Sequence, residues 1–324
     1  MSDSKPIVCV GTSNGVVVLR HAQEGEPWEL ISHGLYGHKV ASLGQHADGS
    51  IFVGLVDGMV QCSKDWETWQ PRFEGLTSTS VYSLAHSPAD PNTVFAGTAP
   101  AGVFVSSDSG LHWSKLANFN KVKSSDNWTY PEAPYMPRVN SLFFHPSNAD
   151  VLFASVEVGG VVASLDRGQT WVDRGAGLPR QVKKLVCPRG AAGRLYASTI
   201  LGFYRSDDLG ESWQNHVNGL PWLDAHALCV DPDNSDHVLL GVNKPNHQGG
   251  TVFSSKNGGL NWELASASLP AAAQAPIASM AAGDKLFYAG TAAGHLYYSA
   301  NATQWALVRP PFQELHCILP LRPL

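Results

Sequence analysis

An eight-residue pattern, S-x-D-x-G-x-x-W, recurs along the chain and limits the folds that the sequence can adopt. Complete copies occupy residues 106–113, 164–171 and 206–213, and a fourth copy, 255–262, has Asn257 in place of the aspartate. Ser and Asp side chains hydrogen-bond to nearby backbone groups and close tight turns, and the glycine supplies a positive φ that residues with a Cβ avoid. The tryptophan buries a large apolar surface beside the turn. The sequence therefore predicts a series of equivalent turns, each followed by a buried aromatic side chain.

Three weaker copies extend the series along the whole chain. Residues 23–28 keep the glycine and the tryptophan, whereas residues 63–69 and 299–305 keep the serine and an Asp or Asn but lack the glycine. Seven tryptophans, spaced 41, 44, 58, 42, 49 and 43 residues apart, share the repeat position: Trp28, Trp69, Trp113, Trp171, Trp213, Trp262 and Trp305. A period in the forties with short strands is typical of β-propeller blades.

Between the turns, each repeat follows one plan of four strands. The innermost strand, a, has the pattern V-x-S-L or a variant of it, and starts at Val40, Val81, Val139, Val182, Ala225 and Ile277. Strand b follows a turn rich in Pro, Asp and Asn, strand c leads into the repeated turn, and the tryptophan opens strand d. The chain begins on a strand b (residues 7–10) and ends on an unpartnered strand a (residues 315–318). We therefore predict an all-β, seven-bladed propeller over residues 1–324, a single domain in which the C-terminal strand pairs with the N-terminal blade and leaves no open edge.

The repeated turn resembles the Asp box, or BNR repeat, of sialidases, xyloglucan-cleaving glycosidases, sortilin-type receptors and photosystem II assembly factors. The resemblance covers the whole chain and implies the propeller fold, but it indicates little about function because one scaffold carries many sites. In the enzymes of this group the Asp boxes lie away from the active site. Asp108, Asp166 and Asp208 are therefore expected to be structural.

The composition and the N-terminal residues indicate which partners and which cellular compartment to expect. The net charge of −5 argues against a nucleic-acid partner, which would favour a basic face. The start MSDSKP leads into a short apolar stretch, so we expect no signal peptide and no membrane span, and a monomeric, cytoplasmic protein. The five cysteines lack a CxxC pair and are typical of reduced thiols: Cys9, Cys62, Cys187, Cys229 and Cys317.

Alignment of the repeats places candidate functional residues at one mouth of the central channel, on the side of the d–a and b–c loops. The second residue of strand a reads, around the ring, Ala41, Tyr82, Asn140, Lys183, His226, Ala278 and His316. The second residue after the strand-b Gly or Ser reads Val56, Ala99, Glu157, Ile200, Asn243, Ala292 and Ser13. Polar residues thus gather on three successive blades beside small apolar walls, as in a pocket for a small ligand.

Two catalytic schemes and one structural interpretation fit these residues. In the first scheme Glu157 is a general acid or base, and Lys183 and His226 tune it or stabilise an anion. Ligand contacts then come from Asn140, Asn243, Tyr82, His316 and Trp222. In the second scheme His226, His316 and His247 bind a divalent metal, although the sequence requires no cofactor and shows no HxH or HExxH spacing. In the structural interpretation, Glu157 and Lys183 only neutralise each other.

The sequence leaves two functions open. One is an intracellular hydrolase- or lyase-like enzyme that acts on a small polar molecule at the channel mouth. The other is a non-catalytic scaffold for a protein partner, like the photosystem II assembly factors. Insertions at residues 117–138 and 243–250 break the repeat on the mouth side, and the first carries Trp128, Tyr130 and Tyr135 as a lid or platform. The arginine motif of sialidases is absent, and the paired acids of the xyloglucan enzymes have no clear counterparts.

Overall fold

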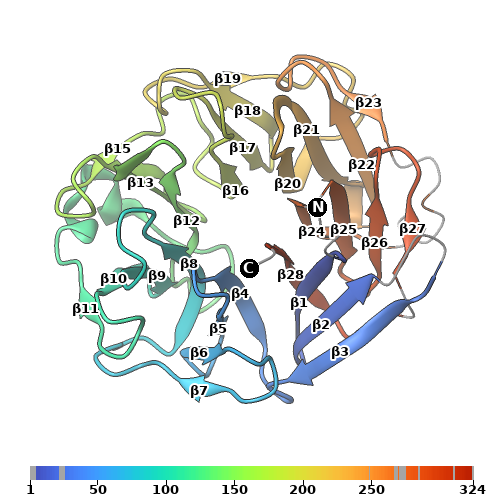
Figure 1. Cartoon of the computed structure of the whole chain (residues 1–324). Coiled ribbons are helices and arrows are strands. Elements are labelled where there is room, and N and C mark those ends of the chain that lie inside the picture. The colour runs from blue at the N-terminus through green and yellow to red at the C-terminus, as the bar shows by residue number, and fades with distance from the viewer. Residues whose placement is uncertain are drawn as a thin grey trace.

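The computed structural model describes residues 5–21, 26–247, 249–265, 269, 275–283, 285–308 and 311–322. Seven antiparallel four-stranded sheets form blades around a central channel, so the predicted seven-bladed propeller is confirmed (Figure 1). The helical segments of the described part are three short 3-10 helices: η1 (Phe119–Lys121), η2 (Lys123–Asn127) and η3 (Pro245–His247). Gln23 and Gly25 of the weakest repeat copy and the side chain of His247 lie outside what the structure describes.

The strands of each blade run a to d from the channel outward. Blade 1 combines β28 (Leu315–Leu321) with β1 (Ile7–Thr12), β2 (Gly15–His21) and β3 (Trp28–Gly34). Blade 2 contains β4 (Val40–Gln45), β5 (Ile51–Leu55), β6 (Val60–Ser63) and β7 (Gln70–Pro71), and blade 3 contains β8 (Ser80–His86), β9 (Val94–Ala99), β10 (Val103–Ser106) and β11 (Ser114–Lys115). Blade 4 contains β12 (Val139–His145), β13 (Asn148–Val156), β14 (Gly160–Ser164) and β15 (Val172–Asp173), and blade 5 contains β16 (Val182–Val186), β17 (Leu195–Thr199), β18 (Gly202–Ser206) and β19 (Gln214–Asn215). Blade 6 contains β20 (Asp224–Asp231), β21 (Asn234–Asn243), β22 (Gly250–Ser255) and β23 (Glu263–Leu264), and blade 7 contains β24 (Ile277–Gly283), β25 (Leu286–Thr291), β26 (Leu296–Ser299) and β27 (Ala306–Leu307).

The ring closes through the two ends of the described chain. Strand β28 pairs antiparallel with β1, with Ile7 opposite Leu321 and Val10 opposite Ile318. Figure 1 shows the red β28 beside the dark blue β1, innermost in the first blade. The predicted pairing is therefore confirmed, and blade 1 has the same four-stranded composition as the other six.

The repeated turns owe their shape to a shared set of hydrogen bonds. Ser106 Oγ donates to Asp108 Oδ1 (2.7 Å) and accepts from the Gly110 N–H (2.8 Å), while Asp108 Oδ1 accepts from the His112 N–H (2.9 Å). The same three bonds recur in the turns at residues 164–170, 206–212 and 255–261. Gly110 has a φ of +84°, which explains the glycine. Bonds from the His112 N–H and ring, and from Ser106, lower the pKa of Asp108 to about 2, as expected for a structural anion.

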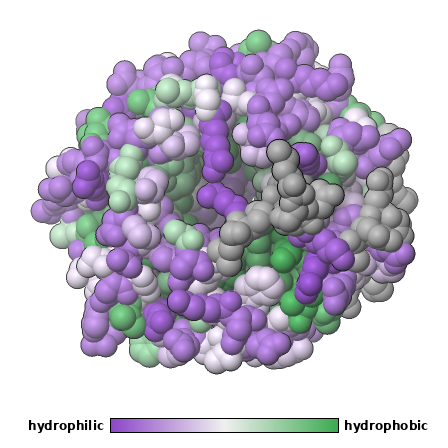
Figure 2. Space-filling view, viewed as in Figure 1, coloured by the Kyte–Doolittle hydropathy of each residue, from purple (hydrophilic) through white to green (hydrophobic). Residues whose placement is uncertain are grey.

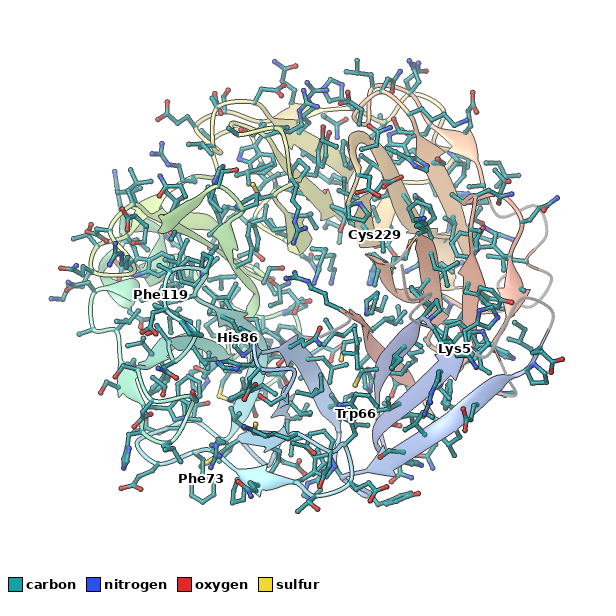
Figure 3. All side chains as sticks on the ribbon, in the orientation of Figure 1. Lys5, Trp66, Phe73, His86, Phe119 and Cys229 are labelled. Atoms are coloured by element: carbon teal, nitrogen blue, oxygen red, sulfur yellow. The ribbon has the colours of Figure 1, made fainter. Side chains whose placement is uncertain are left out.

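Four of the repeated tryptophans join neighbouring blades by a hydrogen bond, whereas the Trp171 indole donates to the Gly168 carbonyl of its own turn (3.0 Å). The indole Nε1 of Trp113 donates to the carbonyl of Arg72, just after strand d of the preceding blade (3.1 Å). The bond recurs from Trp213 to Arg174 (2.8 Å), from Trp262 to His216 (3.0 Å) and from Trp305 to Ala265 (2.9 Å). Side chains fill the spaces between blades (Figure 3). The repeat therefore encodes both a turn and the contact that joins it to the previous blade.

The insertion at residues 117–138 departs from the pattern because its aromatic side chains enter the core. Phe119 is fully buried and lies edge-on to Trp171, with ring centroids 5.0 Å apart. Trp128 is also buried, 5.1 Å from Phe119. Of the three aromatics expected to form a lid or platform, Trp128 instead packs between blades 3 and 4, whereas Tyr135 is exposed.

Candidate functional site

All seven innermost strands carry a β-bulge at the second residue of the V-x-S-L pattern or its variant. In blade 2, Val40 lies opposite Leu55 and Ser42 opposite Gly54, so Ala41 has no partner of its own. The corresponding residue of each other blade is likewise left without a partner in the register: Tyr82, Asn140, Lys183, His226, Ala278 and His316. A bulge sets two residues against one, breaks the alternation of side chains and re-aims them. As a result, each bulged residue and the residue after it line the channel.

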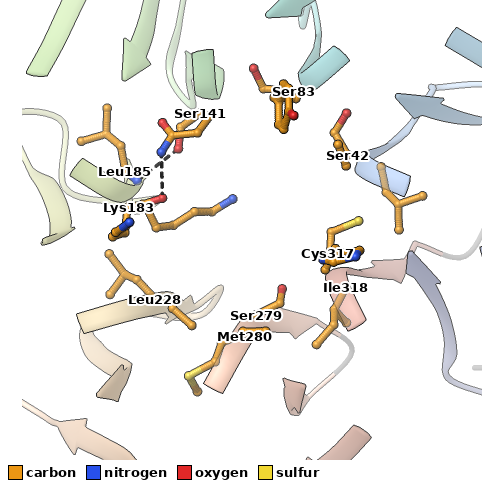
Figure 4. Close-up of a pocket in the computed structure, with 18 of the residues that line it drawn as sticks. Ser42, Ser83, Ser141, Lys183, Leu185, Leu228, Ser279, Met280, Cys317 and Ile318 are labelled. Atoms are coloured by element: carbon orange, nitrogen blue, oxygen red, sulfur yellow. Dashed lines mark hydrogen bonds between the residues drawn. The ribbon is translucent and has the colours of Figure 1, made fainter. Parts of the chain in front are cut away.

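The channel encloses a cavity of about 300 Å³ with three levels of side chains. The upper ring contains the seven bulged residues. The middle ring contains small residues and one lysine: Ser42, Ser83, Ser141, Lys184, Ala227, Ser279 and Cys317. The lower ring is apolar: Leu43, Leu84, Leu142, Leu185, Leu228, Met280 and Ile318. Figure 4 shows serine, lysine and apolar side chains surrounding this space, and Figure 2 shows a hollow at the middle of one face of the ring.

Glu157 is the centre of an ion-pair cluster at the mouth, between blades 4 and 5. Its Oε1 lies 3.0 Å from Lys183 Nζ and its Oε2 lies 3.4 Å from Arg138 Nε. The Arg138 guanidinium in turn stacks on the Tyr130 ring (3.6 Å to the centroid) and lies over the Tyr82 ring (4.7 Å). The Glu157 side chain is only 11% exposed. The structure thus brings together three residues chosen from the sequence, Tyr82, Glu157 and Lys183.

The two asparagines expected to bind ligand instead hold backbone groups. Asn140 Nδ2 donates to the carbonyls of Val182 (2.8 Å) and Lys183 (3.2 Å), and its Oδ1 accepts from the Ser155 hydroxyl. Asn243 is buried, and its Oδ1 accepts from the Ile277 N–H (2.9 Å). Both side chains therefore bridge one blade to the next.

The two histidines and Trp222 are distributed around the rest of the mouth. His226 Nε2 lies 3.0 Å from Asp224 Oδ1, on blade 6. His316 Nε2 lies 3.7 Å from Glu314 Oε2, on blade 1, and burial together with the nearby Lys39 charge lowers the pKa of His316. The Trp222 ring has Lys244 Nζ 5.7 Å from its centroid. None of these three takes part in the Glu157 ion pairs.

Within the described ranges, no group of three or more His, Cys, Asp or Glu side chains is placed to hold a metal ion. His226 and His316, two of the three residues of the metal scheme, belong to different blades and each faces a carboxylate of its own. The five cysteines are free thiols. Nor does any described helix have the length and apolarity needed to cross a membrane.

Two residues of the site escaped the sequence reasoning. Arg138 immediately precedes strand a of blade 4 and lies outside both aligned positions. No motif in the sequence marks it. Lys184 follows an aligned position, and strand alternation would have turned it away from the channel. The signal that marks Lys184 is the V-x-S-L pattern itself. A small residue recurs at the third position of this pattern in most repeats, which indicates that the third position faces the channel like the second.

Comparison with known proteins identifies the fold. No protein-family model matches the chain, and no curated protein matches it. Among solved structures, an ancestral GH74 enzyme has a TM-score of 0.63 at 17% identity, and the GH74 xyloglucanase from Xanthomonas campestris has 0.63 at 18%. Each match covers 83% of this chain but only 38% and 45% of those enzymes, so the chain spans less than half their length.

A second kind of propeller matches over nearly its whole length. The structure of YCF48 bound to D1 peptide has a TM-score of 0.62 at 19% identity, covering 88% of this chain and 87% of that one. Both kinds of neighbour share the propeller architecture with this chain. At these identities the likeness establishes the fold and leaves function to the site itself.

Proposed function

We propose that this propeller binds a small polar molecule at the mouth of its central channel, through the face formed by Tyr82, Tyr130, Arg138 and Lys183. The observation that carries the proposal is the Arg138 guanidinium, fixed between two tyrosine rings and the Glu157 carboxylate. A side chain held on several sides presents its remaining donors in a fixed geometry, which lowers the entropic cost of binding. The bulges place Tyr82 and Lys183 at the rim of a polar cavity, as in small-molecule sites.

The geometry favours binding over hydrolysis by Glu157. Glycoside hydrolysis uses one carboxyl group as a proton donor and a second as base or nucleophile. Each oxygen of Glu157 already faces a cation, Lys183 or Arg138, so the carboxylate holds these two side chains in place. We therefore assign Glu157 the role of positioning the two cations.

A metabolite thermal-shift screen, followed by calorimetric titration of the best binders, tests this proposal. Arg138→Lys keeps the charge but removes the planar group that stacks on Tyr130. We expect it to weaken binding at least tenfold. The control is Arg167→Lys, at an exposed ion pair with Asp150 on an outer turn, which should bind as the wild type does. Equal affinities in the two variants would refute the role of Arg138.

A protein partner is the second candidate function, favoured by exposed apolar side chains around the same mouth. Tyr135 and Met136 precede β12, Ile200 and Leu201 connect β17 to β18, and Leu223 precedes β20. An exposed apolar patch rimmed by polar residues marks many protein-binding surfaces. The likeness to YCF48, solved with a bound peptide, also supports this candidate.

Substitutions test the partner candidate better than deletion of the insertion, because the insertion carries buried Phe119, Val122 and Trp128. Leu201→Asp should remove any partner that docks on the mouth face. Leu307→Asp, at a similarly exposed leucine on the outer strand β27, is the matched control. A partner retained by both variants in affinity purification would argue against the mouth face as its site.

A further inference from the structure

We propose that the channel cavity below the mouth is a binding site for a small oxyanion, a carboxylate or a phosphate, with Lys184 as its principal ligand. This site goes beyond the proposed function. It lies on the middle ring, one residue along strand a from Lys183, and it uses none of the residues of the Glu157 cluster. The argument rests on the charge of the cavity wall, on its free donors and on its size.

The wall of the cavity is cationic and carries no carboxylate among its described lining residues. Its ionisable groups are Lys183 and Lys184, His226 and His316, with the Cys317 thiol and the Tyr82 phenol. Lys183 is neutralised by Glu157, and each histidine faces its own acidic residue. Lys184, by contrast, forms no ion pair with any described residue, and its side chain is exposed to the channel. A cavity lined by an unpaired positive charge and by no described carboxylate attracts anions and raises their local concentration.

The surroundings of Lys184 point to a ligand that enters the channel. Lys184 lines the same cavity as Cys317, which lies on blade 1, three blades away around the ring. The lysine also occupies the one middle-ring position of seven that carries a cation, whereas the other six carry Ser, Ala or Cys. A solvent-filled channel lined only for packing would not need that cation.

Hydroxyl groups on the same ring provide further donors. Ser42 and Ser83 already donate to the carbonyls of Val81 and Val139. Ser141 differs, because its Oγ accepts from the Leu185 N–H (3.3 Å) and its own proton remains available. The Ser279 hydroxyl forms no hydrogen bond with another described residue, and Figure 4 shows it on the channel wall. Lysine and serine hydroxyls together are a suitable donor set for carboxylate or phosphate oxygens.

The cavity volume limits the ligand. A water molecule occupies about 30 Å³ in the liquid, so a space of about 300 Å³ holds the equivalent of about ten waters. The apolar lower ring lines the end of this space away from the mouth. A free phosphate or a small dicarboxylate fits this volume, while larger molecules would also have to occupy the mouth.

Calorimetric titration with inorganic phosphate and with malonate, at low ionic strength and against chloride at matched ionic strength, tests the proposal on the full chain. We expect saturable one-to-one binding of phosphate or malonate but not of chloride, and the two titrations distinguish the two oxyanions. Lys184→Met should weaken binding at least tenfold. Lys256→Met, at an exposed lysine in an outer turn, removes the same charge and should leave affinity unchanged.

A second measurement keeps the test independent of how well the variant folds. Lysines of the wild-type protein are ¹³C-methylated, and the Lys184 signal is assigned by its absence in Lys184→Arg. Addition of the bound anion should shift this signal and leave that of Lys256 in place. The proposal is wrong if no oxyanion binds more tightly than chloride, or if Lys184→Met binds as the wild type does. Because Arg138→Lys leaves the middle ring intact, oxyanion binding that survives in this variant separates the cavity site from the mouth site.

Discussion

Glu157 and Lys183, which belong to adjacent blades, are joined by an ion pair of 3.0 Å in a site where both side chains are mostly buried. The second oxygen of Glu157 faces Arg138. One carboxylate thus neutralises two cations at the channel mouth. Removal of one partner from such a cluster leaves charge uncompensated in a poorly solvated place.

Glu157→Gln should therefore destabilise the protein, because Lys183 and Arg138 lose their common counter-charge. We expect the free energy of unfolding to fall by about 1–3 kcal/mol, measured by urea denaturation. Lys183→Met combined with Glu157→Gln should recover part of the loss, since one uncompensated cation is removed. A Glu157→Gln protein as stable as the wild type but without ligand binding would restore a direct functional role to Glu157.

Asn243→Ala tests whether the buried asparagine is structural. The change leaves the Ile277 N–H without its acceptor inside the protein, which should cost about 1–3 kcal/mol of stability. The control is Asn148→Ala, where an exposed side chain accepts from the Asp150 N–H (3.0 Å) and water can replace it. Thermal unfolding of both variants checks the difference, and equal losses would contradict the bridging role.

Asp208 should make the stability of the propeller sensitive to acid. Burial acts to raise the pKa of Asp208, but hydrogen bonds from Ser212 and Ser206 outweigh it and lower this pKa to about 2. An unfolded aspartate titrates near 3.9. The stabilisation is therefore present above about pH 4 and is lost as the pH falls toward 2.

Substitutions at Asp208 separate the turn from its charge. Asp208→Asn should keep the turn, because Asn257 makes the same bonds in its own copy, and it should flatten the acid dependence between pH 4 and 2. Asp208→Ala removes the acceptor and should cost about 0.5–2 kcal/mol at neutral pH, as loss of a comparable cap does. Fluorescence-detected unfolding across this pH range measures both effects.

Lys184 should oppose stability at neutral pH. Desolvation by the surrounding channel walls lowers the pKa of Lys184, although its side chain is exposed to the channel, and the neighbouring groups on the wall, Lys183, His226, His316 and Cys317, supply no negative charge at pH 7. The folded state then holds its proton less tightly than the unfolded chain, so the penalty is full below the folded pKa and is relieved as the pH rises toward about 10.4. Lys184→Met should be more stable than the wild type at pH 7, with the difference shrinking as the pH rises. A constant difference from pH 7 to 10 would show that this pKa is not lowered.

The sequence was sufficient to predict the fold because turn, glycine and tryptophan act within a few residues of one another. Ser106, Asp108 and Gly110 hydrogen-bond to one another, and the Trp113 indole donates to the neighbouring blade. The residues of one repeat are therefore enough to specify its turn and its contact with the neighbouring blade. The predicted closure also follows from strand order alone. Local rules repeated seven times leave few alternative architectures.

The candidate site was predictable only in part, because it depends on contacts between blades. The aligned second residues line the channel as expected, but their partners come from outside the alignment. Arg138 reaches Glu157 and Tyr130 from an irregular segment, and Asn140 and Asn243 turn to the backbone of the next blade. The repeat in the sequence identifies equivalent positions, but it does not show which side chains will bind to groups on the neighbouring blade.

The position of β28 has a consequence for biosynthesis. It is the last of the described strands to leave the ribosome, yet it is the innermost strand of the first blade. Throughout translation, β1 therefore has an unpaired edge, and the nascent protein is an open arc that other chains can join by edge-to-edge pairing. Premature termination before Leu315 would release an arc that cannot close. Synthesis of β28 thus acts as the step that converts an association-prone chain into a closed ring.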